Sequence, residues 1–203
     1  MAAPVPKTVP LTDGGAILKR MVDAVEKVRQ RLLRATAALK SAGIDYAVVG
    51  GNAVAAWVKT VDPGGIRTTL DVDVLVRRSD FEAARAALEA AGFVYRHAAS
   101  LDMFLDDPAA SPREAVHILF AREKVRDDQP EPNPDVSESV EMDSVRFATL
   151  DALVRNKLST YRLKDRMHLI DLIQIGLVDQ SWTQRFSPTM GERLQSLLDS
   201  PDQ

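Results

Sequence analysis

The chain has 203 residues, 45% of them hydrophobic, which is enough to bury a core as one domain or as one domain with a small appendage. A formal net charge of -3 and a pI near 5.7 give no global basic field that would attract nucleic acid. The absence of cysteine excludes disulfides, thiolate metal sites and a cysteine nucleophile. The start of the chain lacks the apolar core of a signal peptide, and no run reaches the roughly 18 apolar residues of a membrane span. A cytoplasmic protein with no membrane partner is expected.

The periodicity of apolar residues predicts an α/β protein. Residues 1–15 are Pro-rich and are expected to form a flexible tail. Apolar residues then recur alternately at helical and at strand spacing. Helices are predicted at 16–40, 52–60, 81–91, 150–177 and 190–198, and strands at 45–50, 70–77, 93–97, 103–105 and 115–120.

Two local signals refine this organisation. Ser79, with Glu82 three residues later, predicts a capping box at the start of the third helix. The acidic segment 127–143 contains three prolines and predicts an exposed loop that separates two halves of the chain. The expected division is an α/β core over 16–147, including the N-terminal helix, and a helical lobe over 148–203.

Asp71 and Asp73 are the first candidate site residues. In a strand, residues two apart point to the same face about 6.5 to 7 Å apart, so the two carboxylates lie side by side while the valines between and after them face the core. They repel each other unless a positive group lies nearby. An isolated Asp-x-Asp fits either a solvated strand face or a Mg²⁺ site, because hard cations prefer carboxylate oxygens.

The preceding glycines favour the metal site. Gly50 and Gly51 lie where a strand meets a helix, and glycine there lets the backbone approach a ligand closely. The first turn of a helix also offers unpaired N–H groups that favour phosphate. Tight packing of strand on helix would equally explain a glycine pair alone. A phosphate-binding turn followed by a strand with Asp-x-Asp combines the two halves of a metal-nucleotide site.

This pattern resembles the polymerase-β-like nucleotidyltransferase superfamily: a hydrophobic strand, Gly-Gly, a helix, then Asp-x-Asp. Within it, the motif formed by Arg67, Thr69, Asp71 and Asp73 is similar to the AbiEii-type group, which includes toxins of toxin–antitoxin systems. A later helical signature of that group is matched by Lys157, Arg162, Asp165 and Asp171. The resemblance runs from about Asp45 to Leu177. It implies a mixed sheet flanked by helices, followed by a small helical lobe that covers the nucleotide.

His117 is a departure from the superfamily pattern, which usually places a third carboxylate on a later strand. The candidate strand reads EAVHILF, and His117 occupies the expected position. Imidazole accepts protons near neutral pH and binds Mn²⁺ better than Mg²⁺. His117 is therefore a general base, a ligand of a softer metal, the mark of a lost activity, or a locally hydrogen-bonded histidine at the edge of the core.

The C-terminal helical pattern supplies positive charge. At 100° per residue, one polar stripe is expected to contain Lys157, Tyr161, Lys164, His168 and Asp171. The stripe is either a solvated face or the wall of a cleft, and its overlap with the group signature favours the cleft. Asp165 falls among the apolar residues, three positions after Arg162, and is expected to pair with it.

The resemblance implies a nucleotidyltransferase that uses Mg²⁺, or Mn²⁺, to move a nucleoside monophosphate from a nucleoside triphosphate to a hydroxyl group. Asp71 and Asp73 would bind the metal, and His117 would be catalytic. The residues expected around the nucleotide are Gly50, Gly51, Asn52, Arg67, Thr69, Lys157, Tyr161, Arg162, Lys164 and Asp165. The acceptor is left open among tRNA, a protein and a small molecule, and a toxin with an antitoxin partner is one form of this function. The alternative is a non-catalytic module that binds nucleotide or a partner.

Overall fold

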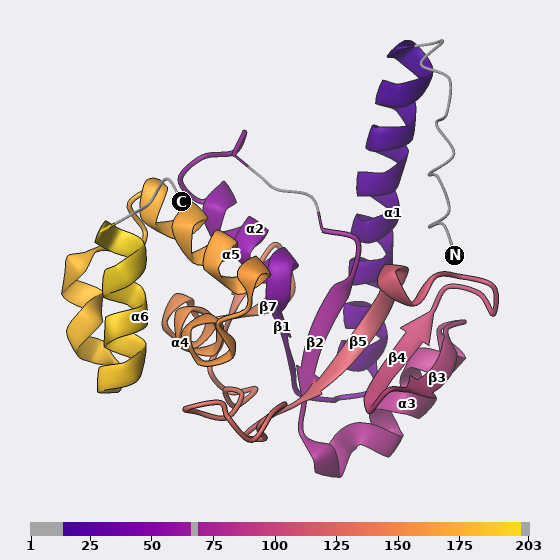
Figure 1. The fold of residues 1–203 in the computed structure, drawn as a ribbon. Helices are drawn as coiled ribbons and strands as arrows, with labels where there is room; N and C mark the ends of the chain where they lie inside the picture. Colours follow the sequence, from indigo (N-terminus) through magenta and orange to yellow (C-terminus); the bar gives the residue numbers. More distant parts are fainter. Residues whose placement is uncertain (1–13, 66–68, 200–203) are drawn as a thin grey trace, which may run out of the picture.

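The computed structural model describes residues 14–65 and 69–199 (Figure 1). Its α-helices are α1 Gly14–Ser41, α2 Gly50–Lys59, α3 Phe81–Ala90, α4 Leu150–Thr160, α5 Leu163–Gln174 and α6 Pro188–Asp199. Its strands are β1 Tyr46–Val49, β2 Val72–Val76, β3 Val94–Ala98, β4 Leu101–Leu105, β5 Ala115–Phe120, β6 Ser139–Met142 and β7 Val145–Ala148. Three short 3₁₀ helices complete the description: η1 Arg78–Asp80, η2 Pro112–Glu114 and η3 Gln180–Arg185.

The seven strands form one mixed sheet in the order β3-β4-β5-β2-β1-β7-β6. The central pair β2–β5 is parallel and β1–β2 is antiparallel, while β1 and β7 are parallel. The predicted α/β class with a mixed sheet and flanking helices is therefore confirmed. The buried faces of these strands are rich in valine, a residue whose branched side chain packs well on a pleated surface.

The helices cover the sheet in two groups. α1 packs against α3 and contacts β2 and β5, while α2 contacts β1, β2 and β7 and meets α4 and α5. Figure 1 shows α4, α5 and α6 together at one side of the molecule, away from α3 and β3, and the N-terminal part of α1 extending beyond the sheet. α2 therefore lies where the sheet meets the C-terminal helices, and its first turn directly follows the central strand β1.

Two predictions about the starts of helices need correction. α1 begins at Gly14, so the last two residues of the predicted tail are helical. The predicted cap of α3 is wrong: the hydroxyl of Ser79 donates to Asp80, and the helix has no side-chain cap. Turn η1 leads directly into α3, and its carbonyl at Arg78 accepts from the N–H of Phe81, so no side-chain cap is required.

The segment 127–143 is also not an exposed loop throughout. Its last residues form β6, and Gln129, Asn133 and Val136 are buried. The side-chain amide of Asn133 donates to the carbonyl of Phe120 and accepts from the amide of Asn156, at 3.0 Å each. These hydrogen bonds satisfy the polar groups of a segment whose prolines prevent regular structure, so it packs against α4.

None of the described helices combines the length and the apolar character needed to cross a bilayer.

Candidate active site

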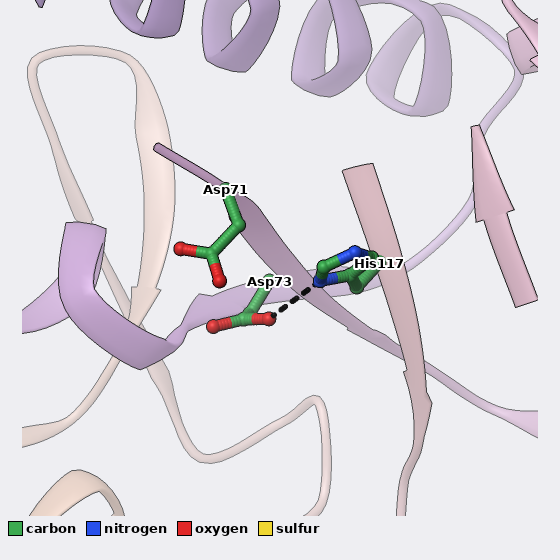
Figure 2. A group of neighbouring side chains, drawn as sticks. All are labelled: Asp71, Asp73 and His117. Carbon is green, nitrogen blue, oxygen red and sulfur yellow. Dashed lines mark ion pairs between the residues drawn. The ribbon is translucent and has the colours of Figure 1, made fainter. Parts of the chain in front are cut away.

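The site lies at the entrance to β2 and the neighbouring start of β5. Asp73 of β2 is paired across the sheet with His117 of β5, and Asp71 immediately precedes β2 (Figure 2). One ligand atom from each of the three residues can be chosen such that all lie within 4.8 Å of one another. The predicted adjacency of Asp71 and Asp73 on one face is thus realised, and His117 joins them.

Lys164 relieves the repulsion between the two acids. Its Nζ lies 3.3 Å from both carboxylate oxygens of Asp71, and the hydroxyl of Thr69 donates to the same carboxylate. Although burial by itself raises the pKa of Asp71, the hydrogen bond from Thr69 and the charge of Lys164 hold it below its ordinary value. Asp71 is therefore ionised at neutral pH.

His117 is oriented by the turn that precedes its strand. Its Nε2 lies 2.9 Å from the carbonyl oxygen of Pro112, and its Nδ1 lies 3.5 Å from Oδ1 of Asp73. Since a carbonyl only accepts, Nε2 carries the proton, and Nδ1 is directed at the carboxylates. Burial lowers the pKa of His117, but the hydrogen bonds to Asp73 and Pro112 and the negative charge of Asp73 and Asp71 raise it above the usual value. Sequence reasoning missed Pro112, because a backbone carbonyl leaves no signal in a motif.

The absence of side chains at Gly50 and Gly51 leaves space for the side chains of Asp73 and Thr69. Gly50 has φ +66°, and a Cβ placed there would lie 1.9 Å from Oδ2 of Asp73. A Cβ on Gly51 would lie 3.0 Å from the side chain of Thr69. The side-chain amide of Asn52 donates to the backbone carbonyl of Asp71 at 2.7 Å. The first turn of α2 and the entrance to β2 are therefore built against each other, and the N-cap residue Val49 makes no side-chain cap bond to α2.

A pocket of about 440 Å³ opens beside this cluster. Its walls come from α2, β4, the start of β5 and α5, and its lining includes Gly51, Thr69, Asp71, His117, Lys164, His168 and Asp171. The stripe predicted along the C-terminal helices thus lines a cleft at Lys164, His168 and Asp171.

The same prediction is wrong for Lys157 and Tyr161. The helix breaks at Tyr161, which has φ +45°, so α4 and α5 do not share one helical phase. The hydroxyl of Tyr161 donates to the backbone carbonyl of Arg193 at 3.0 Å, and Lys157 is only 3% exposed. Neither residue lines the pocket.

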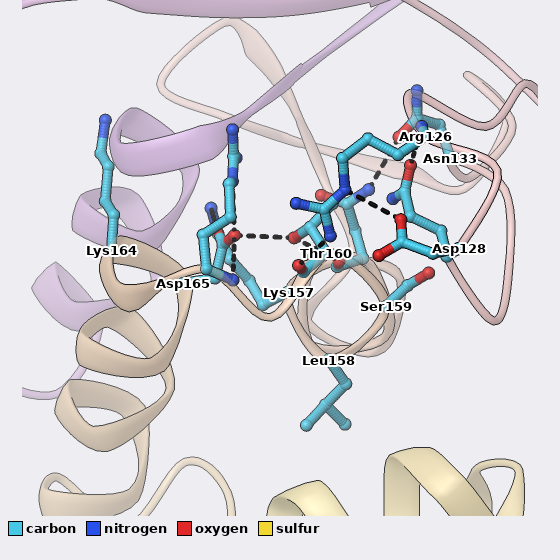
Figure 3. A network of polar contacts seen from close by, with 12 residues as sticks. Arg126, Asp128, Asn133, Lys157, Leu158, Ser159, Thr160, Lys164 and Asp165 are labelled. Carbon is cyan, nitrogen blue, oxygen red and sulfur yellow. Dashed lines mark hydrogen bonds and ion pairs between the residues drawn. The ribbon is translucent and has the colours of Figure 1, made fainter.

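Lys157 instead belongs to a buried network that joins α4 to α5 (Figure 3). Its Nζ donates to Asp165 at 3.0 Å, and the other oxygen of Asp165 accepts from Thr160 at 2.8 Å and from Nε of Arg162 at 2.9 Å. Burial raises the pKa of Asp165, but the positive charge of Lys157 and the bond from Arg162 hold it far below the ordinary value. The predicted pair between Arg162 and Asp165 is present. Arg67 lies outside the described residues.

Comparison with known proteins identifies the fold. No family model matches the chain, and no curated protein matches its sequence. Among solved structures, an antigenic nucleotidyltransferase-like protein from Paracoccidioides brasiliensis is 16% identical with a TM-score of 0.56, over 87% of this chain and 89% of that one. A candidate nucleotidyltransferase from H. pylori is 12% identical with a TM-score of 0.50, over 88% and 78%.

The chain has a nucleotidyltransferase fold. At these identities the likeness concerns the fold alone. The nucleotidyltransferase fold agrees with the resemblance drawn from the Gly-Gly and Asp-x-Asp motifs. The glycine pair begins α2 and the Asp-x-Asp motif lies at the start of β2, and Gly51 and Asp71 line the pocket.

Proposed function

We propose that this chain is a divalent-cation-dependent nucleotidyltransferase that moves a nucleoside monophosphate from a nucleoside triphosphate to a hydroxyl group. The observation that carries the proposal is the convergence of Asp71, Asp73 and His117 beside the start of α2, with Asp71 and His117 in the wall of a pocket. In the reaction, the hydroxyl oxygen bonds to the α-phosphorus, the bond from that phosphorus to the bridging oxygen breaks, and pyrophosphate leaves. The hydroxyl proton goes to solvent or to a nearby base.

The three side chains fit a divalent cation. Two carboxylates offer the oxygen ligands that Mg²⁺ and Mn²⁺ share, and an imidazole nitrogen shifts the preference toward Mn²⁺. The Nδ1 of His117 faces the carboxylates while its Nε2 is held by a backbone carbonyl, which is the usual arrangement of a metal-binding histidine. When bound, the cation neutralises charge that develops on the transferred phosphoryl group. We assign Asp71 and Asp73 as its carboxylate ligands and His117 as its third ligand.

The phosphates belong at the start of α2. The N-cap residue Val49 leaves the N–H groups of the first turn without a side-chain cap of its own, and the helix dipole favours negative charge there. Lys164 lines the pocket beside Asp71. Asp165 aligns the guanidinium of Arg162 and raises its pKa. The negative charge of Asp73 and Asp71 raises the pKa of Arg162 further. We propose that the backbone of Gly50 and Gly51, together with Lys164 and Arg162, binds the triphosphate.

The remaining predicted residues position the groups that bind the cation and the triphosphate. Asn52 and Thr69 hold the backbone and the carboxylate of Asp71, so we assign them to positioning that ligand. Lys157 and Asp165 align Arg162 from inside the helical lobe, and Tyr161 links the junction of α4 and α5 to α6. Arg67 precedes this site in the chain, and its nucleotide contact stays a prediction.

The arrangement also separates donor and acceptor. The phosphate-binding groups come from α2 and α5, whereas His117, the turn at Pro112 and β4 supply other parts of the pocket lining. In-line displacement needs the attacking hydroxyl and the leaving pyrophosphate on opposite sides of the phosphorus. We therefore place the nucleotide along α2 and α5 and the acceptor beside β4 and β5.

Label transfer tests this function. The protein is incubated with each α-labelled nucleoside triphosphate and Mg²⁺ or Mn²⁺ in a lysate, which is then separated into RNA, protein and small molecules. Label in one fraction, lost with the Asp73→Asn variant, would support the proposal and name the acceptor class. Nucleotide binding without transfer to any fraction would favour the non-catalytic alternative, which the histidine at the third acidic position already suggests.

The AbiEii-type grouping and a toxin role rest on the motif around Arg67 and Asp71 and on the helical signature. Expression in a bacterial host tests that role. Growth arrest by the wild-type chain, absent with Asp73→Asn and reversed by a small protein from the adjacent reading frame, would support a toxin with an antitoxin partner.

A further inference from the structure

His168 occupies the pocket wall one turn beyond Lys164 on α5. Its side chain lines the pocket, yet the residue is only 8% exposed. Its Nδ1 is buried without a hydrogen-bond partner among the described residues. Buried polar atoms are nearly always hydrogen-bonded, so an unpaired one in a pocket wall points to a functional role. Because Nδ1 is buried, the ring nitrogen left for a molecule in the pocket is Nε2.

The imidazole is neutral. Burial and the positive charges of Lys157 and Lys164 lower the pKa of His168 to about 4, against the weaker opposing effect of Asp165 and Asp73. A neutral imidazole carries one N–H, and a buried N–H without an acceptor is rarer in proteins than an unpaired acceptor. The tautomer with the hydrogen on Nε2 avoids burying an unpaired donor. It presents a neutral N–H to the pocket.

We propose that His168 binds a sugar hydroxyl of the nucleoside triphosphate by a hydrogen bond from Nε2, an inference that rests on the proposed nucleotidyltransferase function. A neutral donor suits a neutral acceptor, whereas the phosphates are matched by Lys164 at the metal end of the same helix face. Four residues along a helix correspond to a rise of about 6 Å, so His168 follows Lys164 on the same face, one turn further along α5. The sugar is the part of a nucleotide that adjoins the α-phosphate, and His168 is on the nucleotide side of the pocket.

The test measures binding, so it does not depend on transfer. Calorimetry with Mn²⁺ compares the tightest nucleoside triphosphate, its 2′-deoxy and 3′-deoxy forms, and inorganic triphosphate. The variants are His168→Leu, which keeps bulk without a donor, and His168→Gln, whose amide nitrogen can reproduce Nε2–H. His97→Gln is the matched control, because His97 is an exposed histidine on β3 and does not line the pocket. Thermal melting shows whether each variant is folded.

We expect His168→Leu to weaken nucleoside triphosphate binding about tenfold, the value of one hydrogen bond, with inorganic triphosphate unaffected. The deoxynucleotide that lacks the hydroxyl contacted by His168 should bind the wild type as weakly as the full nucleotide binds the His168→Leu variant. His168→Gln should recover most of the affinity, and His97→Gln should match the wild type.

An equal loss for inorganic triphosphate, or unchanged nucleotide affinity in His168→Leu, would overturn the assignment. The assignment would also fail if His168→Leu weakened the binding of both deoxynucleotides as much as it weakens the binding of the full nucleotide. Each of these results can occur in a protein that transfers label, so the proposed function could stand without this role for His168. A wild-type protein that binds no nucleoside triphosphate would refute both.

Discussion

Asp73 and His117 are register partners in the parallel pair of β2 and β5, with Nδ1 of the histidine 3.5 Å from Oδ1 of the aspartate. The side-chain period of a strand is two, so a slip of one residue would turn His117 to the opposite face of the sheet. The buried residues Val116 and Ile118, which flank His117 on β5, oppose such a slip because it would turn them away from the core. The geometry of the cluster is therefore set by the central sheet and not by loops.

Asp73→Asn should abolish label transfer and leave the protein folded. An amide is a poorer cation ligand than a carboxylate, and the loss of several kcal/mol of transition-state stabilisation corresponds to a rate at least about a hundredfold lower. The free energy of unfolding should change by no more than about 1 kcal/mol. Retained activity in a folded variant would remove Asp73 from the site.

Asp71→Asn should also lose transfer, but it should not stabilise the protein. Unrelieved repulsion between Asp71 and Asp73 is not present, because Lys164 and Thr69 both contact Asp71. The half-exposed ion pair with Lys164 is worth at most about 1 kcal/mol, so a slight destabilisation is expected. Chemical denaturation of the two Asp variants and the wild type checks the sign.

His117→Asp distinguishes a metal ligand from a base. As the third ligand, an aspartate should favour Mg²⁺ and raise the activity ratio of Mg²⁺ to Mn²⁺, because it replaces nitrogen by oxygen. His117→Asn should lower activity with both ions. If both variants retain wild-type rates with both ions, His117 is structural. If both lose activity with an unchanged metal preference and unchanged metal affinity, His117 acts as a base instead.

Gly50→Ala should inactivate the protein by displacing Asp73. The new Cβ would overlap the Asp73 carboxylate, and the left-handed backbone adds a cost of about 1–2 kcal/mol. Gly43→Ala is the matched control, since Gly43 has φ +69° and open space around its Cβ position. Both variants should lose stability, but only Gly50→Ala should lose transfer activity. Equal activity loss in both would trace the effect to the backbone alone.

Substitutions at Lys157 and Lys164 should have different effects, the first on stability and the second on nucleotide binding. Lys157→Met leaves the buried Asp165 without one of its partners and should cost about 3 kcal/mol of unfolding free energy. Lys164→Met removes an exposed partner of Asp71 and should cost at most about 1 kcal/mol, but it should weaken nucleotide binding at least several-fold. Denaturation curves and calorimetry on both variants test this, and the reverse pattern would restore Lys157 to the phosphate site.

The sequence predicted the parts of the site that depend on local pattern. Alternating valines placed Asp71 and Asp73 on one face, and the strand predicted at 115–120 coincides with β5. The glycine pair located the start of α2, although its contact with Asp73 emerges only from the structure. These features could be predicted because each depends on residues within a single strand or a single helix turn.

The parts that failed depend on contacts between distant segments. A helical wheel drawn across Tyr161 assumed one continuous helix, and the left-handed conformation at that residue changed the phase of everything before it. The hairpin of β6 and β7 was missed because β6 lies at the end of the acidic, Pro-rich segment 127–143. That segment is ordered by bonds such as the one from Asn156 to Asn133, which no local pattern reveals.

The stability of the protein should decrease between about pH 6.5 and pH 4 through His168. The folded state holds this imidazole neutral down to about pH 4, whereas in the unfolded chain it titrates near 6.5. Within that interval the unfolded state binds more protons, so the free energy of unfolding falls as the pH falls, and no contribution is expected above the interval. The charged groups that influence His168 are Lys157, Lys164, Asp165 and Asp73.

His168→Gln isolates this contribution, because its amide does not titrate. The difference in unfolding free energy between wild type and variant should be constant above about pH 7 and should shift in favour of the variant as the pH decreases toward 4. Asp165, whose pKa is lowered in the folded state, contributes a further loss only near and below its ordinary pKa of 3.8, and it does so in both proteins. Urea denaturation at half-unit pH steps provides the comparison. Parallel curves for the two proteins from pH 7 to pH 4 would show that His168 takes up its proton equally in both states, contrary to a neutral imidazole buried in the pocket wall.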